Sequence, residues 1–157
     1  MRSVALNVLF KLGMLGAITF WGEQASAQVI PITWETLTDV SFVDKYSEEY
    51  EALYYYPTFG PSVKALQGKE VQITGYMLIF DTDKKVYVLS QNPFSACFFC
   101  GKGGPETIVE LHMKPGDYNF HMDDWVTVKG RLKLNVEDFF QCNYVLEKVE
   151  VVEISEK

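Results

Sequence analysis

The sequence is short of positive charge. Its 157 residues contain 14 Lys and Arg against 21 Asp and Glu, which gives a formal net charge of −7 at pH 7. An acidic chain repels phosphate backbones, so we expect no nucleic-acid partner. Motifs of common catalytic sites are also missing: no His-Glu-x-x-His occurs, and no Gly-rich phosphate loop joins a strand pattern to a helix pattern. We therefore expect a binding or accessory protein rather than an enzyme.

Long apolar runs are missing as well, and this decides how the N-terminus is interpreted. The apolar run from Leu12 to Trp21 follows two basic residues and precedes Ala25-Ser26-Ala27, an A-x-A cleavage signature. The run is too short to cross a bilayer core of about 30 Å. We expect the first 27 residues to be a signal peptide, cut after Ala27. The mature chain is then periplasmic or secreted and has no membrane span.

Cysteine is scarce, with three residues in the whole chain: Cys97, Cys100 and Cys142. An odd number in an exported protein indicates a leftover thiol or a ligand set. Cys97 and Cys100 lie in the segment SACFFCGKGGPE. A Cys-x-x-Cys turn permits either a disulfide or two legs of a tetrahedral metal site. We expect Gly101 to adopt a positive φ and to help aim backbone N–H groups at the sulfurs, which would stabilise thiolate.

Alternating apolar residues in the second half of the chain predict a mainly β protein. Five strands are expected over residues 70–81, 86–91, 107–113, 124–136 and 143–154. Mid-strand glycines at 75 and 130 suit a small closed barrel, and the pattern looks like an OB-fold over residues 68–157. Residues 28–67 are expected to be an irregular to helical extension that packs on the barrel, with short helical turns near Trp34 and over Ser62–Leu66. We expect the tyrosines at 54, 55 and 56 to cover the core rather than to form a binding patch.

Three runs of the sequence resemble a family of uncharacterised secreted bacterial OB-fold-like proteins: ITWETLTDVSF, YPTFGPSVKALQGKEVQITGYM and the loop NPFSACFFCGKGGPETIVEL. In other branches of that family the loop carries Cys-x-His in place of Cys-x-x-Cys, and some members are associated with transporter genes linked to metal supply. The resemblance implies a metal-transport component or another exported protein as partner. Phe99 occupies the position at which those branches have His. A site shared with them would therefore use Cys100 in place of that His.

A cysteine cluster is the sharpest hypothesis that the sequence allows. In an OB barrel the third and fifth strands run parallel, so the turn before the fifth strand should bring Cys142 to the loop of Cys97 and Cys100. The three thiols would then hold Zn²⁺ or a similar thiophilic ion, with Glu106 or a water as the fourth ligand. His112 is expected about 16 Å along its strand and out of reach, and His121 is expected to be solvated.

Other interpretations of the same residues stay open. A disulfide between Cys97 and either Cys100 or Cys142 would leave one thiol, and an exported compartment favours that outcome. The pair Cys97 and Cys100 would also serve a thiol–disulfide redox protein. A third alternative is a structural interaction module with a stapled loop. Phe98 and Phe99, beside the cysteines, would then act as lids over the barrel end or as an apolar contact site.

Overall fold

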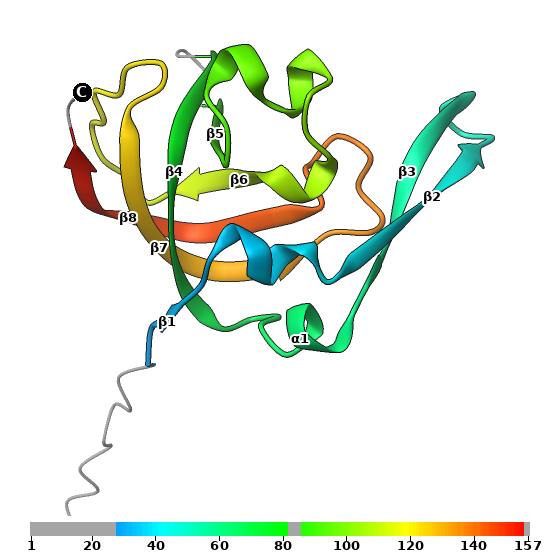
Figure 1. The fold of residues 1–157 in the computed structure, drawn as a ribbon, viewed down its shortest axis with the longest axis horizontal. Coiled ribbons are helices and arrows are strands. Elements are labelled where there is room, and N and C mark those ends of the chain that lie inside the picture. Colours follow the sequence, from blue (N-terminus) through cyan, green and yellow to red (C-terminus); the bar gives the residue numbers. More distant parts are fainter. Residues whose placement is uncertain (1–27, 82–85, 156–157) are drawn as a thin grey trace, which may run out of the picture.

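The computed structural model describes residues 28–81 and 86–155. The predicted signal peptide, residues 1–27, lies outside the described residues. Strands make up most of the described chain, and its helices are single short turns (Figure 1). None of the helices in this part of the chain is long and apolar enough to cross a membrane.

Five strands close into a barrel. They are β4 (Glu70–Asp81), β5 (Val86–Ser90), β6 (Ile108–Met113), β7 (Trp125–Leu134) and β8 (Tyr144–Ser155). Their order is β4-β5-β6-β8-β7, and a further pairing of β4 with β7 closes the barrel. The pair β6–β8 is parallel and the other pairs are antiparallel. The predicted OB-like barrel is confirmed, with strand ends shifted by one or two residues, and β1 (Ile30–Pro31) adds a short parallel pairing to β4.

The alternation along β4 shows why this sequence forms a barrel wall. Val71, Ile73 and Gly75 are buried, while the residues between them are half-buried. At Gly75 an added Cβ would lie 2.6 Å from the Ser90 carbonyl oxygen and 2.8 Å from the Trp34 ring. Glycine is needed here because the Trp34 ring and the neighbouring strand approach the β4 backbone closely, and not only because the strand coils.

The N-terminal extension contains the two predicted helical turns and a hairpin that we did not predict. The turns are the 3-10 helix η1 (Trp34–Thr38) and α1 (Pro61–Lys64). Between them β2 (Val40–Ser47) pairs antiparallel with β3 (Ala52–Phe59), and this hairpin projects away from the barrel (Figure 1). The expectation of an irregular segment here is wrong. Its aromatic and β-branched residues favour strands, and each strand gains its hydrogen bonds from the other.

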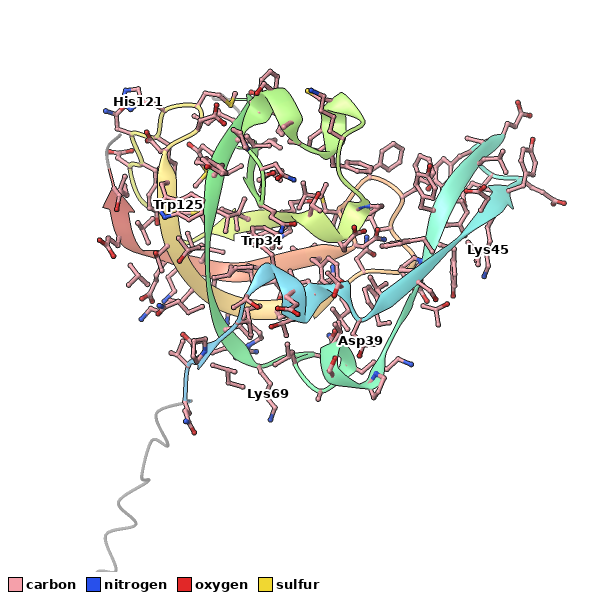
Figure 2. All side chains as sticks on the ribbon, viewed as in Figure 1. Trp34, Asp39, Lys45, Lys69, His121 and Trp125 are labelled. Carbon is pink, nitrogen blue, oxygen red and sulfur yellow. The ribbon has the colours of Figure 1, made fainter. Side chains whose placement is uncertain are left out.

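Both ends of the hairpin are fixed to the barrel. Leu37 before β2 and Phe59 at the end of β3 are buried in the same core as the barrel strands, together with Val63 of α1. The Tyr144 hydroxyl of β8 donates a hydrogen bond to the Leu37 carbonyl oxygen at 2.6 Å. The Trp34 indole N–H, visible on the face of the barrel in Figure 2, donates to the Thr74 carbonyl oxygen at 2.8 Å. The extension therefore shares one core with the barrel.

Candidate functional site: the cysteine end of the barrel

The connection between β5 and β6 carries two of the three cysteines. It consists of three single-turn 3-10 helices: η2 (Phe94–Ala96), η3 (Phe98–Cys100) and η4 (Pro105–Thr107). Cys97 is the residue that ends η2 and begins η3, and Gly101 ends η3 with φ of +71°. The predicted positive φ is confirmed. The N–H groups of Gly101 and Lys102, however, donate to the carbonyl oxygens of Phe98 and Cys97 rather than to sulfur, because they close the 3-10 turn.

Cys97 and Cys142 approach one small buried cluster. Cys97 is completely buried among three apolar side chains, and Cys142, half-buried, packs against the same cluster. The buried apolar members are Leu78, Val88 and Ile108. Cys142 precedes β8 as the cysteine loop precedes β6, and the two strands run parallel. The topology thus brings the segment of Cys142 to the end of the barrel where the sequence predicted it.

Cys100 is the exposed member of the set. Its Sγ donates to the Phe94 carbonyl oxygen at 3.0 Å, and its side chain is also hydrogen-bonded to that of Cys97. All three cysteines carry free thiols. The pair Cys97 and Cys100 is therefore in direct contact, and Cys142 belongs to the same end of the barrel through the buried cluster.

Two of the thiols are held in their neutral form. Burial, together with the nearby Glu110 carboxylate, raises the pKa of Cys142 to about 12. Loss of solvation raises the pKa of Cys100, the contact with Cys97 raises it further, and Lys102 opposes both. A thiol with a raised pKa is a weak nucleophile at neutral pH, because the thiolate is the reactive form.

The predicted fourth ligand points elsewhere. The Glu106 carboxylate lies against the backbone of Gly104, where an added Cβ would meet it at 2.2 Å. The carboxylate that reaches Cys142 is Glu110, whose Oε2 accepts a hydrogen bond from the Cys142 backbone N–H at 3.0 Å. The other oxygen of Glu110 contacts His112 Nε2 at 2.8 Å.

His121 is solvated as predicted, whereas His112 lies nearer to the Cys142 turn than its place along the strand predicted, because both contact the Glu110 carboxylate. His112 is exposed on β6 and is linked to the Cys142 turn only through Glu110. His121 is more exposed, lies at the opposite end of the molecule from Lys45 (Figure 2), and has Asp124 as its neighbour. Within the described ranges, no three His, Cys, Asp or Glu residues are already arranged around one metal position. Cys97, Cys100 and Cys142 are the soft ligands that a thiophilic ion could draw together, with Glu110 nearer to them than Glu106.

A pocket of about 540 Å³ opens beside the cysteines, between the β2–β3 hairpin and the loops that precede β6 and β8. Cys142 lies on its wall, and eight of the other described residues that line it are aromatic. The rings are those of Tyr50, Tyr54, Tyr55, Tyr56, Phe98, Phe99, Phe139 and Phe140. The expectation that the tyrosines cover the core is wrong, because the projecting hairpin carries them away from the barrel. Of the phenylalanines, Phe98 packs on the buried cluster as a lid would.

The sequence matches no protein-family model and no curated protein. Among solved structures, it is similar to a DUF3299 family protein from Pseudomonas aeruginosa, with a TM-score of 0.50 and 17% sequence identity. The match covers 82% of this chain and 99% of that chain. The likeness is one of fold. It agrees with the β-barrel derived above, and the chemistry of the site has to be argued from this chain's own residues.

Sequence reasoning missed Glu110 and the aromatic pocket. Glu110 lies two residues before His112 on β6, and its position beside Cys142 depends on the register that pairs Glu110 with Val145. The pocket was missed because residues 40–59 were not recognised as a hairpin. The aromatic residues of segment 52–59 favour a strand by composition and could have revealed it, although the segment has no apolar–polar alternation.

Proposed function

We propose that the protein is an exported, non-enzymatic accessory that binds a thiophilic metal ion, such as Zn²⁺, through Cys97, Cys100 and Cys142. The observation that carries this proposal is that Cys97 and Cys142, from two loops, pack on one buried cluster, while Cys100 follows Cys97 at the end of the same 3-10 turn. The partner, on this proposal, is a metal-transport component or another exported protein. Export itself rests on the pattern of residues 1–27.

Metal capture requires a small rearrangement of the loop. The Cys100 thiol has to leave the Phe94 carbonyl oxygen, to which it donates at 3.0 Å. Cys142 already packs against the cluster that contains Cys97. A tetrahedral ion bound to the three sulfurs at about 2.3 Å would leave one position for a carboxylate or a water. We favour Glu110 over the originally predicted Glu106, because Glu110 already contacts the backbone of Cys142.

The thiol environments favour metal capture over disulfide exchange. An exchange reaction needs a thiolate before the partner arrives, and Cys100, the exposed thiol, has a raised pKa. A metal ion supplies its own positive charge and deprotonates the thiol as it binds. Burial of Cys97 and Cys142 also suits sulfurs that are to be enclosed around an ion.

The test is a Zn²⁺ titration of the reduced protein by calorimetry, in two buffers of different ionisation enthalpy. We expect one ion per chain, with the three thiols releasing their protons as they become thiolate ligands, so that affinity rises with pH. Cys142→Ser and Cys100→Ser should weaken binding to a similar degree, each by roughly 100-fold or more, and each should remove one proton from the release. His121→Ala, whose side chain is 76% exposed and has Asp124 as its neighbour, is the control and should change nothing.

The fourth ligand is decided by a pair of variants. Glu110→Gln should weaken Zn²⁺ binding by roughly tenfold, and Glu106→Gln should leave it unchanged. If Cys142→Ser binds Zn²⁺ like the wild type, the three-thiol site is wrong and a two-cysteine redox pair or staple replaces it. The metal proposal fails if the reduced protein binds no thiophilic ion. It also fails if the mass of the purified protein shows a disulfide that persists when metal is added.

A further inference from the structure

The aromatic rings of the pocket hold one another in place. Tyr50 stacks on Phe139 with ring centroids 5.1 Å apart and an interplanar angle of 16°. Phe140 meets Tyr50 edge-on at 5.5 Å, and Tyr54 meets Phe139 edge-on at 5.7 Å. Phe140 nevertheless stays 79% exposed, which is unusual for a large apolar side chain. The pocket thus presents preorganised ring surface that an occupant could cover.

The charged groups of this pocket are all acidic. Glu49, Glu137 and Asp138 line it, and none of the described residues in its wall is Lys or Arg. Glu49 and Asp138 also lie close enough to the Tyr50 phenol to raise its pKa, Glu49 having the larger effect. Three carboxylates around aromatic faces create a region of negative potential, since each ring face carries the negative side of its quadrupole.

The chain already places one cation against these rings. The Lys45 ammonium on β2 lies 3.1 Å from the centroid of the Tyr56 ring, on the projecting hairpin of Figure 2. Tyr56 belongs to the pocket wall, and Lys45 does not. This contact shows that a tyrosine face of the hairpin accepts a cation. Among the contacts of the described chain, no cation lies over the rings of Tyr50, Phe139 and Phe140.

We propose that this pocket binds a small organic cation, an ammonium or amidinium group carried on an apolar or aromatic body. Its volume of about 540 Å³ is in the range of small-molecule sites. The rings would cover the apolar body and face the cationic centre, while Glu137 and Asp138 would supply long-range attraction. This site is distinct from the proposed metal centre, with which it shares the wall at Cys142 and, through Phe98 and Phe99, the loop between Cys97 and Cys100.

The experiment uses a matched pair of probes, trimethyl(3-hydroxyphenyl)ammonium and its neutral isostere 3-tert-butylphenol, with the reduced full-length mature protein in the presence of a chelator. Binding is followed by the chemical shifts of the aromatic side chains. The cation should bind saturably and at least about fivefold more tightly than the isostere, because only the cation gains from the carboxylates and the ring quadrupoles. Equal affinities for the two probes, or no saturable binding of the cation, would overturn the proposal.

Two variants separate charge from ring surface. The double variant Glu137→Gln/Asp138→Asn should lower the affinity for the cation by about threefold to tenfold and leave the isostere unchanged. The Asn at 138 keeps the side-chain oxygen that accepts from the Phe140 N–H, so the loop geometry is preserved. Phe140→Ala should weaken both probes, and its exposure means that folding is not at risk. If the double variant binds the cation like the wild type, the pocket does not select for charge and the proposal fails.

Controls keep this result apart from the metal proposal. Glu153→Gln, on β8 away from the pocket, is the charge control, and Tyr46→Ala, an exposed hairpin residue outside the pocket wall, is the ring control. Both should bind the cation like the wild type. Cys100→Ser should lose Zn²⁺ binding and keep the cation, so that failure of either site is recognised without reference to the other. A Cys100→Ser protein that loses the cation would contradict the independence claimed here.

Discussion

At the scale of single residues, Glu110 links strand β6 to the turn that carries Cys142. One oxygen of its carboxylate accepts from the Cys142 backbone N–H, and the other contacts His112. It also contributes to the raised pKa of Cys142, after burial itself. A residue that looked like part of a solvated strand face therefore sets both the position and the protonation of a predicted metal ligand.

The raised pKa of Cys142 predicts a loss of stability in alkali. An unfolded cysteine ionises near pH 8.5, whereas Cys142 in the fold has a pKa of about 12. The neutral thiol's contribution is thus intact below about pH 8.5 and is lost as the pH rises toward about 12, because only the unfolded chain ionises in that interval. Urea unfolding of reduced, metal-free protein should show the wild type losing stability relative to Cys142→Ser as pH rises, by at most about 5 kcal/mol.

The wild type and Cys142→Ser contain the same tyrosines and lysines. The difference between their stabilities therefore excludes the effect of titrating those residues. Parallel stability curves for wild type and Cys142→Ser across the alkaline range would mean that the thiol is not buried as described.

At the scale of elements, β4 and the β2–β3 hairpin differ in how far the sequence predicts them. The strand β4 was predicted over 70–81 and spans Glu70–Asp81, since its alternation and flanking signals agree. The hairpin was missed because its residues are apolar or aromatic on both faces, so neither face reads as a core face. Its strands pair with each other over their full length and contact the barrel chiefly at their ends. Strands that pair mainly with each other leave little apolar–polar periodicity in the sequence.

The close approach at the middle of β4 predicts the effect of one added methyl group. Gly75→Ala should cost about 1 to 3 kcal/mol, because the new Cβ would meet both the Ser90 carbonyl oxygen and the Trp34 ring. The Trp34 ring should be displaced, which tryptophan fluorescence would report. Combining Gly75→Ala with Trp34→Leu should cost less than the sum of the single changes, because one of the two clashes is removed. Strict additivity would show that the ring does not pack on Gly75.

At the scale of the whole molecule, one core joins the N-terminal extension to the barrel. Leu37 is fully buried in this core, and its carbonyl oxygen accepts the hydrogen bond from the Tyr144 hydroxyl. The barrel could be predicted because its five strands each carry a pattern and an OB topology has few alternatives. Of the candidate site, only the part that depends on topology could be predicted. Cys142 lies at the same end of the barrel as the cysteine loop because β6 and β8 are parallel. Side-chain directions, such as that of Glu106, follow from packing that no periodicity encodes.

The shared core predicts that Leu37→Ala destabilises the entire protein by about 2 to 5 kcal/mol, since it opens a cavity between extension and barrel. Chemical unfolding should remain a single transition, seen together by far-UV and aromatic signals. Leu53→Ala is the matched control, because Leu53 is 69% exposed on the hairpin and should change stability by less than about 0.5 kcal/mol. Separate transitions for the wild type's extension and barrel would contradict the single core.

Because Cys142 follows the cysteine loop in the chain, the three cysteines are synthesised in a fixed order. A chain is made from its N-terminus, and 142 − 100 = 42 residues separate Cys100 from Cys142. At about 5 to 20 residues per second, roughly 2 to 8 s pass between their appearances. During that interval Cys97 and Cys100 exist without Cys142, and β8 has not yet been made to cover the end of the barrel. Whether Cys97 and Cys100 form a disulfide or stay as free thiols can therefore be determined before Cys142 has been synthesised.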